Sequence, residues 1–217
     1  MRLDDVLANA RLYLIFTEEL SELPLEEALP AAVAGGVDLV QIREKGDAAK
    51  RIELARRALD ALAGAGTPVI VNDDPEAAVA AGAHGVHLGP EDMPPAAALK
   101  ILAPGMVLGL STTTVADALA AVKSGAHYIG VGTVFATGTK RGKTIIGPLA
   151  AARVARSVPV PAFPIGGIDA AGARELARAG LRRAAVCSAI ISGRNVEERA
   201  AAIRASLEAP PPRGSRS

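Results

Sequence analysis

Residues 68–88 read PVIVNDDPEAAVAAGAHGVHL, and this stretch contains the unit from which the whole chain is built. An apolar run over 68–72 is followed by an Ala-rich stretch, and a second apolar run occupies 85–88. The Ala-rich stretch begins with Pro75 and ends before Gly82. Pro at the first helical position and Gly just past the last one are typical of a helix. The stretch therefore predicts a strand, a helix and a second strand.

The same alternation recurs along the chain. We expect strands at 12–17, 39–44, 68–72, 85–88, 107–111, 128–134, 162–166 and 183–188. A helical stretch follows each one, and the clearest, with apolar residues three and four positions apart, are 48–63, 115–124, 170–178 and 196–207. Eight strands alternating with helices over 217 residues predict the α/β class and a single (β/α)8 TIM barrel.

An open doubly wound sheet is the alternative fold. Such a sheet usually carries a Gly-rich phosphate loop after its first strand. Here the first strand runs into IFTEEL at 15–20, which contains no glycine, so the closed barrel is favoured. We expect one barrel domain over 1–209 and a disordered tail, PPPRGSRS, over 210–217.

Composition limits the classes of partner. The formal net charge is +1, and no apolar stretch approaches the roughly 20 residues of a membrane span, so we expect neither a nucleic-acid nor a membrane partner. Cys187 is the lone cysteine, which excludes an internal disulfide and indicates a reducing cytoplasm. Small-molecule substrates remain as the expected partners, and the oligomeric state, a homo-oligomer included, stays open.

The second expected strand ends in a row of polar side chains. Alternate residues of a strand share a face, so Gln41, Arg43 and Lys45 point together, opposite Ile42 and Glu44. In barrel enzymes the chemistry collects at the carboxyl ends of the strands. One amide and two cations at the barrel mouth predict a site for an anion such as a diphosphate. A solvated strand end is the alternative.

The third and fourth strands each deliver carboxylates to the same rim. Asp73 and Asp92 are candidates to share one Mg²⁺, which typically takes one or two protein carboxylates and completes its shell with phosphates and water. The alternative is that Asp73 or Asp74 caps the helix that starts at Pro75, which we favour for Asp74 and less for Asp73, which lies closer to the strand. His87 lies mid-strand and is interpreted as a hydrogen-bonded core residue rather than a base.

The later strands contribute small and hydroxylated residues. Ser111 shares a face with Gly109, where a missing side chain would open space for a ligand, although Ser111 alone is more typical of a helix cap. The loop over 135–143 is rich in hydroxyls and cations, as expected of a loop that closes over phosphates or of a solvated surface loop. Gly167 would let backbone approach a phosphate near the loops after strands seven and eight. Cys187 is interpreted as a small buried residue with no cation beside it.

These segments, in this order, resemble the thiamine-phosphate synthase family. The resemblance rests on Gln41-Ile42-Arg43-Glu44-Lys45, Asn72-Asp73, His87-Leu88-Gly89-Pro90-Glu91-Asp92, Gly109-Leu110-Ser111, Thr137-Gly138-Thr139-Lys140, Ile165-Gly166-Gly167-Ile168 and Ser188-Ala189-Ile190. It implies an enzyme that couples 4-amino-2-methyl-5-hydroxymethylpyrimidine diphosphate to hydroxyethylthiazole phosphate, giving thiamine phosphate and diphosphate with the help of Mg²⁺.

The resemblance also implies roles for single residues. The pyrimidine diphosphate would be held by the segment Gln41, Ile42, Arg43, Glu44 and Lys45 and by Asn72, Ser111 and Lys140. The thiazole phosphate would be held by Thr137, Gly138, Thr139, Gly167, Cys187 through its backbone, and Ser188. Asp73 and Asp92 would bind Mg²⁺, and Arg43, Lys45, Ser111 and Lys140 would act in the chemical step.

Several positions depart from the family pattern, and none of them carries an implied role. They are His84 and His127 in place of Asp, Pro90 in place of Gln, Thr113 in place of His, Thr133 in place of Pro, and Arg182-Arg183 in place of Asp-Gly. Two alternatives to the synthase stay open. One is a related thiazole tautomerase, which would want an imidazole near Thr113, and the other is a catalytically silent barrel that binds thiamine phosphates.

Overall fold

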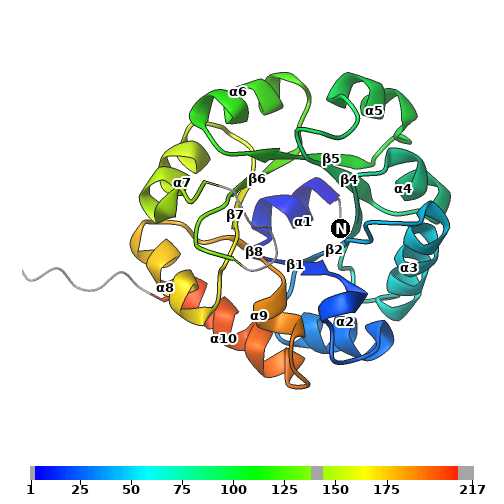
Figure 1. The fold of residues 1–217 in the computed structure, drawn as a ribbon, viewed down its shortest axis with the longest axis horizontal. Coiled ribbons are helices and arrows are strands. Elements are labelled where there is room, and N and C mark those ends of the chain that lie inside the picture. The colour runs from blue at the N-terminus through cyan, green and yellow to red at the C-terminus, as the bar shows by residue number, and fades with distance from the viewer. Residues whose placement is uncertain (1–2, 138–143, 210–217) are drawn as a thin grey trace, which may run out of the picture.

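The computed structural model describes residues 3–137 and 144–209, and its strands form a closed barrel. The eight strands pair in parallel in sequence order, and β1 pairs with β8 to close the ring (Figure 1). They are β1 (Leu12–Phe16), β2 (Leu39–Ile42), β3 (Val69–Asn72), β4 (Gly85–Leu88), β5 (Val107–Thr112), β6 (Tyr128–Gly132), β7 (Ala162–Ile165) and β8 (Ala184–Val186). The predicted (β/α)8 barrel is confirmed, and the strands differ from their expected ranges only at their ends.

The helices form the outer ring around the strands (Figure 1). They are α2 (Leu25–Ala34), α3 (Ala48–Ala61), α4 (Pro75–Ala81), α5 (Pro95–Ile101), α6 (Val115–Lys123), α7 (Gly147–Arg156), α8 (Ala170–Arg178) and α10 (Val196–Glu208). Three short elements were not expected: α1 (Leu3–Asn9), the 3-10 turn η1 (Glu18–Leu20) and α9 (Ser188–Ile191). Within the described ranges, the search for a helix of membrane-spanning length and apolarity found none.

The opening stretch folds as its residues predict. Pro75 begins α4, and Gly82 ends it in the left-handed conformation, with φ 75°. Glycine adopts that conformation at little cost because it has no Cβ. Gly35, which ends α2, has φ −77° and is not left-handed. The space around Gly35 is too small for a side chain, since a Cβ there would lie 2.3 Å from the carbonyl oxygen of Glu197.

Alternation along the strands separates two buried layers. Val40 and Ile42 belong to the layer between strands and helices, whereas Leu39 and Ile70 belong to the layer inside the barrel. The helices contribute mainly Ala and Leu to the outer layer, which suits close approach to the sheet. The inner layer holds both tyrosines of the chain and Phe163.

These three aromatic rings pack edge to face inside the barrel. The centroid distances are 5.7 Å between Tyr13 and Tyr128, 5.4 Å between Tyr13 and Phe163, and 5.8 Å between Tyr128 and Phe163. Edge-to-face packing at such separations is favourable because the ring edge and the ring face carry opposite partial charges. A chain with 2% aromatic residues thus concentrates them where three strands face the barrel axis.

The amino-terminal end of the barrel is covered by α1, which lies across the ring of strands (Figure 1). Arg183, just before β8, donates hydrogen bonds to the carbonyl oxygens of Ala8 and Ala10 at the end of this helix. A guanidinium suits the carboxyl end of a helix, where carbonyl groups lack partners. We call this end of the barrel the floor, and the opposite end the mouth.

Side-chain acceptors on the floor join neighbouring strands. Before β2, Asp38 accepts hydrogen bonds from the backbone N–H groups of Arg11 and Leu12. Before β4 and β6, His84 and His127 accept in the same way, His84 Nδ1 from the N–H of Val69 at 3.1 Å and His127 Nδ1 from that of Leu108 at 3.0 Å. A neutral imidazole supplies one acceptor nitrogen, so it satisfies a strand N–H as a carboxylate does.

Gly109 does not open space for a ligand, contrary to the sequence-based interpretation. A Cβ at this position would lie 2.2 Å from Cζ of Tyr128 and 2.6 Å from Nδ1 of His87. The space left by the missing side chain is therefore occupied by the chain's own Tyr128 and His87. Gly130 serves His87 in the same way, since its Cβ would lie 3.3 Å from the imidazole Cε1.

We predict that Gly109→Ala destabilises the barrel by at least about 1–3 kcal/mol, because a methyl group there collides with two buried rings. Gly46→Ala is the control, since its new Cβ would be 3.6 Å from the nearest atom, an ordinary contact. Urea denaturation of both variants and the wild type measures the difference. Equal midpoints for the two variants would contradict this account of Gly109.

Candidate active site

All eight strands point the same way, so their carboxyl ends and the segments that follow them lie at the mouth. Arg43 after β2 and Cys187 after β8 are near enough that the Arg43 charge acts on the Cys187 thiol. Burial has the larger effect and raises the pKa of that thiol, so the neutral form is favoured. The expectation of an inert thiol fits this shift, whereas the expectation of no neighbouring cation is wrong.

The polar row predicted for β2 extends past the strand, which ends at Ile42. Gln41 is buried inside the barrel, Arg43 is partly buried, and Lys45 is exposed. Ile42 points into the outer layer, and Glu44 pairs with Lys50 of α3 at 3.3 Å. Of the five residues in this segment, Ile42 and Glu44 therefore have side chains committed away from the mouth, and only their backbone is left to contact a ligand.

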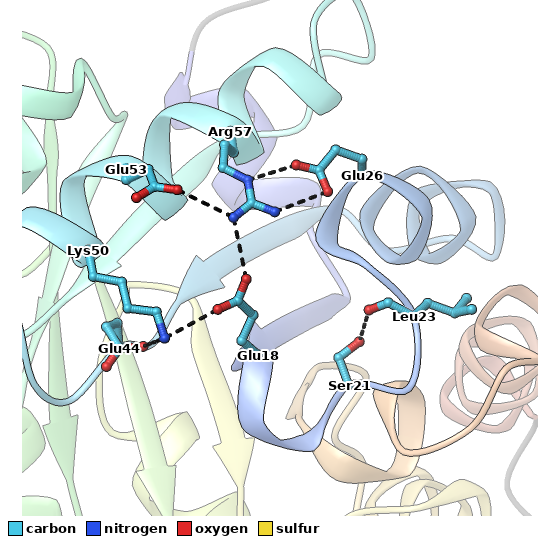
Figure 2. Close-up of polar contacts among 8 residues, drawn as sticks. All are labelled: Glu18, Ser21, Leu23, Glu26, Glu44, Lys50, Glu53 and Arg57. Carbon is cyan, nitrogen blue, oxygen red and sulfur yellow. Dashed lines mark hydrogen bonds and ion pairs between the residues drawn. The ribbon is translucent and has the colours of Figure 1, made fainter.

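A network of charged side chains holds the segments after β1 and β2 (Figure 2). Lys50 pairs with Glu18 and with Glu44, each at 3.3 Å. Arg57 of α3 donates through Nε to Glu26 of α2 at 2.7 Å and lies 3.4 Å from the other oxygen of Glu18. The two cations of α3 thus fasten η1 and the segment that carries Arg43 and Lys45 to the outer helices.

Arg51 joins the segments after β2 and β3. Its Nε donates to the carbonyl oxygen of Glu44 at 3.1 Å, and its Nη1 pairs with a carboxylate oxygen of Asp74. The other oxygen of Asp74 accepts from the N–H of Ala77 at 2.8 Å, which caps α4. The predicted capping role of Asp74 is confirmed.

Asp73 is the one non-glycine residue with positive φ among the described residues, at 68°. Its N–H donates to the carbonyl oxygen of His87 at 2.8 Å, which ties it to β4. A side chain in this conformation costs free energy, and such residues concentrate at functional sites. Asp92, after β4, accepts through Oδ2 from the N–H of Gly89 at 2.6 Å. A backbone bond thus ties Asp73 to β4, and the Asp92 carboxylate is held within the loop that follows β4.

A chain of hydrogen bonds also crosses the inside of the barrel. Gln41 Nε2 donates to the Tyr13 hydroxyl at 2.6 Å, and the two tyrosine hydroxyls lie 2.9 Å apart. The Tyr128 hydroxyl is 3.2 Å from Nδ1 of His87, and Nε2 of His87 is 3.0 Å from Oγ of Ser111. We call these five residues the barrel chain. It begins at a buried amide on β2 and ends at an exposed hydroxyl on β5.

Burial controls the protonation of the barrel chain. Both tyrosines are fully buried, and this raises the pKa of each phenol well above its ordinary value, so both stay neutral. The interpretation of His87 as a hydrogen-bonded core residue is confirmed. Ser111 is not a helix cap, because Thr114 caps α6 in a reciprocal pair with Asp117. The two tyrosines were not identified from the sequence as members of a polar chain, although alternation along β1 and β6 would have placed both side chains inside the barrel.

The segments after β6 and β7 lie against one another. Gly167 has φ 63°, and a Cβ there would be 2.2 Å from the carbonyl oxygen of Ala136. The backbone of Gly167 is thus in close contact with the loop after β6. Thr137 is partly buried in that loop, while Gly138, Thr139 and Lys140 and the expected tail at 210–217 lie outside the described residues.

The end of β8 differs from its prediction. The strand stops at Val186, and Ser188 begins the short helix α9 instead of ending the strand. Cys187 precedes this helix and is partly buried, whereas Ser188 is exposed. The structure therefore places a helix start after strand eight, where the N–H groups of Ile190 and Ile191 already donate to the carbonyl oxygen of Cys187.

Comparison with known proteins gives consistent matches over most of the chain. A sequence model of the family described as thiamine monophosphate synthase matches residues 12–190. A thiamine-phosphate synthase of Shouchella clausii is 37% identical over 203 residues, which cover 91% of this chain and 96% of that protein. One from Gloeobacter violaceus is 42% identical over 86% of this chain, and this chain spans about half (54%) of its length.

Solved structures agree. A thiamine phosphate pyrophosphorylase from Pyrococcus furiosus superposes with a TM-score of 0.83 and 31% identity, covering 95% of this chain and 98% of that one. A 3-hexulose-6-phosphate synthase superposes with a TM-score of 0.68 at 18% identity, covering 90% of this chain and 99% of that one. The second likeness is one of fold alone.

We predict that Arg57→Met lowers the free energy of unfolding at neutral pH by about 1 kcal/mol or less, because exposed ion pairs generally contribute no more than that to stability. The hydrogen bond from Arg57 lowers the pKa of Glu26 below its ordinary 4.5. A carboxyl whose pKa is lower in the folded state contributes stability above its unfolded pKa and loses it as the pH falls.

The difference between wild type and Arg57→Met should therefore shrink as the pH is lowered below 4.5. Urea denaturation at pH 7 and at about pH 3.5 measures it. Arg56→Met is the matched control, because Arg56 donates to the carbonyl oxygen of Ala80 rather than to a carboxylate. A difference for Arg57→Met that stays constant with pH would contradict the assignment.

Proposed function

The chain belongs to the thiamine monophosphate synthase family and is a transferase of thiamine biosynthesis, and we propose that it couples 4-amino-2-methyl-5-hydroxymethylpyrimidine diphosphate to hydroxyethylthiazole phosphate. The products would be thiamine phosphate and diphosphate. A cytoplasmic setting fits the lone Cys187. One observation carries the proposal: the candidate residues belong to or follow seven strands whose carboxyl ends lie at the same end of a closed barrel.

The proposed pyrimidine diphosphate site lies over β2 to β5. Its residues are Gln41, Arg43, Lys45, Asn72 and Ser111, with Lys140 contributed by the loop after β6 and with backbone contacts at Ile42 and Glu44. Cations suit a diphosphate, and buried or partly buried amides such as those of Gln41 and Asn72 suit the polar edge of a pyrimidine. The Lys50–Glu44 ion pair and the hydrogen bond from Arg51 to the carbonyl oxygen of Glu44 support this site by fixing the segment between Glu44 and α3.

The proposed thiazole phosphate site lies over β6 to β8. Its residues are Thr137, Gly138, Thr139, Gly167, Cys187 through its backbone, and Ser188. The start of α9 supports the proposal, because backbone N–H groups near the loops after strands seven and eight commonly hold a phosphate in barrel enzymes. The contact of Gly167 with the loop after β6 joins the two parts of this site.

Mg²⁺ fits the residues present at the mouth. No group of three His, Cys, Asp or Glu that could hold a metal occurs within 3–137 and 144–209. Asp73 and Asp92, on neighbouring loops, match an ion that takes only one or two protein carboxylates and completes its shell with substrate phosphates and water. When bound, such an ion would offset negative charge on the departing diphosphate.

The chemistry needs charge and position rather than a protein base. Bond breaking between the pyrimidine methylene and the diphosphate leaves the electron pair on the diphosphate, and the thiazole nitrogen supplies the pair for the new bond. Because that lone pair is free, no proton has to be removed from it. Arg43, Lys45 and Lys140 would stabilise the leaving group, and Ser111 would donate to it or orient the pyrimidine.

We predict that Asp92→Ala and Lys140→Ala each lower the rate of coupling by roughly 100-fold or more, as loss of a charge-stabilising group does. The assay contains both phosphorylated substrates and Mg²⁺ and measures thiamine phosphate. Glu91→Ala is the matched control, since Glu91 is an exposed carboxylate beside Asp92 without a proposed role. Circular dichroism checks that each variant is folded.

The same assay separates the alternatives. Tautomerase activity without coupling would replace the proposal by a thiazole tautomerase, although Thr113, where an imidazole would be wanted, donates its hydroxyl to the carbonyl oxygen of Gly132. Binding of both phosphates without turnover would indicate a silent barrel. Full activity of Asp92→Ala would remove Asp92 from the metal site.

We further predict a dissociative path, because an aminopyrimidine can stabilise positive charge on its methylene carbon. Replacing the 2-methyl group of the pyrimidine by an electron-withdrawing group should slow the chemical step steeply with the wild-type enzyme. Single-turnover kinetics isolates that step from binding and product release. An unchanged rate would refute this path and leave direct displacement by the thiazole nitrogen.

A further inference from the structure

We propose that the barrel chain of Gln41, Tyr13, Tyr128, His87 and Ser111 donates in one direction only and presents the Ser111 hydroxyl to the mouth as a hydrogen-bond donor. Tyr128 and His87 are then positioning residues that act through Ser111. The direction of the chain is a property of the fold. What Ser111 donates to rests on the proposed function: an acceptor atom of the pyrimidine diphosphate.

The direction follows from the first bond. Gln41 Nε2 is an amide nitrogen and can only donate, so the oxygen of Tyr13, at 2.6 Å, accepts. Both phenols are neutral, and each therefore has one hydrogen to donate. The Tyr13 hydrogen goes to the Tyr128 oxygen at 2.9 Å, and the Tyr128 hydrogen goes on toward His87.

The last two bonds carry this order to the surface. Nδ1 of His87 accepts from Tyr128, so in the neutral ring the hydrogen sits on Nε2. Nε2 then donates to Oγ of Ser111 at 3.0 Å. Oγ accepts that bond, which leaves the hydroxyl hydrogen of the exposed Ser111 to point out of the barrel. A group at the mouth therefore meets a hydroxyl donor whose direction is set by the four hydrogen bonds of the barrel chain.

Packing keeps the members of the barrel chain in place. Phe163 packs edge to face against both tyrosines, and the His87 ring lies 5.5 Å from that of Tyr128. Gly109 and Gly130 leave room for these rings and for nothing larger, since a Cβ at Gly109 would overlap both partners of the Tyr128–His87 bond. The rings therefore have little freedom to turn and break the chain.

The opposite direction makes a different, measurable prediction. If the amide of Gln41 were turned, its oxygen would accept from Tyr13, and every later bond would reverse. His87 would then carry its hydrogen on Nδ1, and Ser111 would donate to Nε2 and face the mouth as an acceptor. An acceptor suits neither a diphosphate oxygen nor a ring nitrogen. The tautomer of His87 reports which direction is present.

The first test is 15N NMR of the three histidine rings in the wild-type protein at neutral pH. His84→Gln and His127→Gln identify the His87 resonances by elimination. We expect a pyrrole-like Nε2 and a pyridine-like Nδ1 for His87, and Tyr128→Phe should abolish this preference because it removes the donor to Nδ1. Thr112→Val is the matched control, since it removes a buried hydroxyl of β5 that bonds Gly130 rather than the chain.

Either of two results would overturn the proposal. One is a hydrogen on Nδ1 of His87 in the wild type, which reverses the direction. The other is a His87 ring unaffected by Tyr128→Phe, which removes Tyr128 from control of the tautomer. Because this measurement needs no substrate, it decides the direction of the chain even if the proposed coupling reaction is absent.

The second test is a double-mutant cycle on kcat/KM for the pyrimidine diphosphate. We expect Ser111→Ala and Tyr128→Phe each to lower kcat/KM by about tenfold, the usual effect of one lost hydrogen bond. If Tyr128 acts through Ser111, the double variant should be no worse than Ser111→Ala alone. The pair Thr112→Val with Ser111→Ala should show independent, multiplying effects.

Multiplying losses for Tyr128→Phe and Ser111→Ala would show that Tyr128 acts by another route and would overturn the positioning role. Absence of coupling by the wild-type enzyme would instead defeat the proposed function, while the NMR result on His87 would stand. The two failures are thereby distinguished.

Discussion

Closure of eight parallel strands into one ring is the constraint on which the remaining structure depends. Since every strand runs in the same direction, each carboxyl end is delivered to the mouth whatever its position in the sequence. Residues as distant as Arg43 and Cys187 become electrostatic neighbours because β1 pairs with both β2 and β8. The closed ring also creates the buried interior in which two neutral phenols, an amide and an imidazole bond to each other.

The sequence was sufficient for the fold because its signals are local and repeated. Pro75 and Gly82 mark the two ends of one helix, and the apolar runs on either side have the length of buried strands. The inward position of Gln41 followed from strand alternation alone, as did the outward position of Ile42. The capping role of Asp74 was likewise readable, since a helix start beside a proline is a short-range pattern.

Features that depend on contacts across the ring could not be read in this way. Gly109 looked like space for a ligand, but that space belongs to side chains from β4 and β6. Ser111 looked like a helix cap, because neither the reciprocal cap of Thr114 nor the bond to His87 has a linear signature. The cation near Cys187 was missed because it comes from a strand more than one hundred positions earlier in the chain. Distances between strands, not residue types, decide these cases.

The bonds on the floor have a consequence for how such a chain can diverge. His84, His127 and Arg183 differ from the family pattern, yet each makes a specific bond that secures a strand or α1. The strands separate these bonds from Asp73, Asp92 and Ser111 at the other end. Selection for folding can therefore act on the residues at the floor, and selection for ligand binding on the residues at the mouth. Substitutions at the floor are compatible with an unchanged reaction at the mouth.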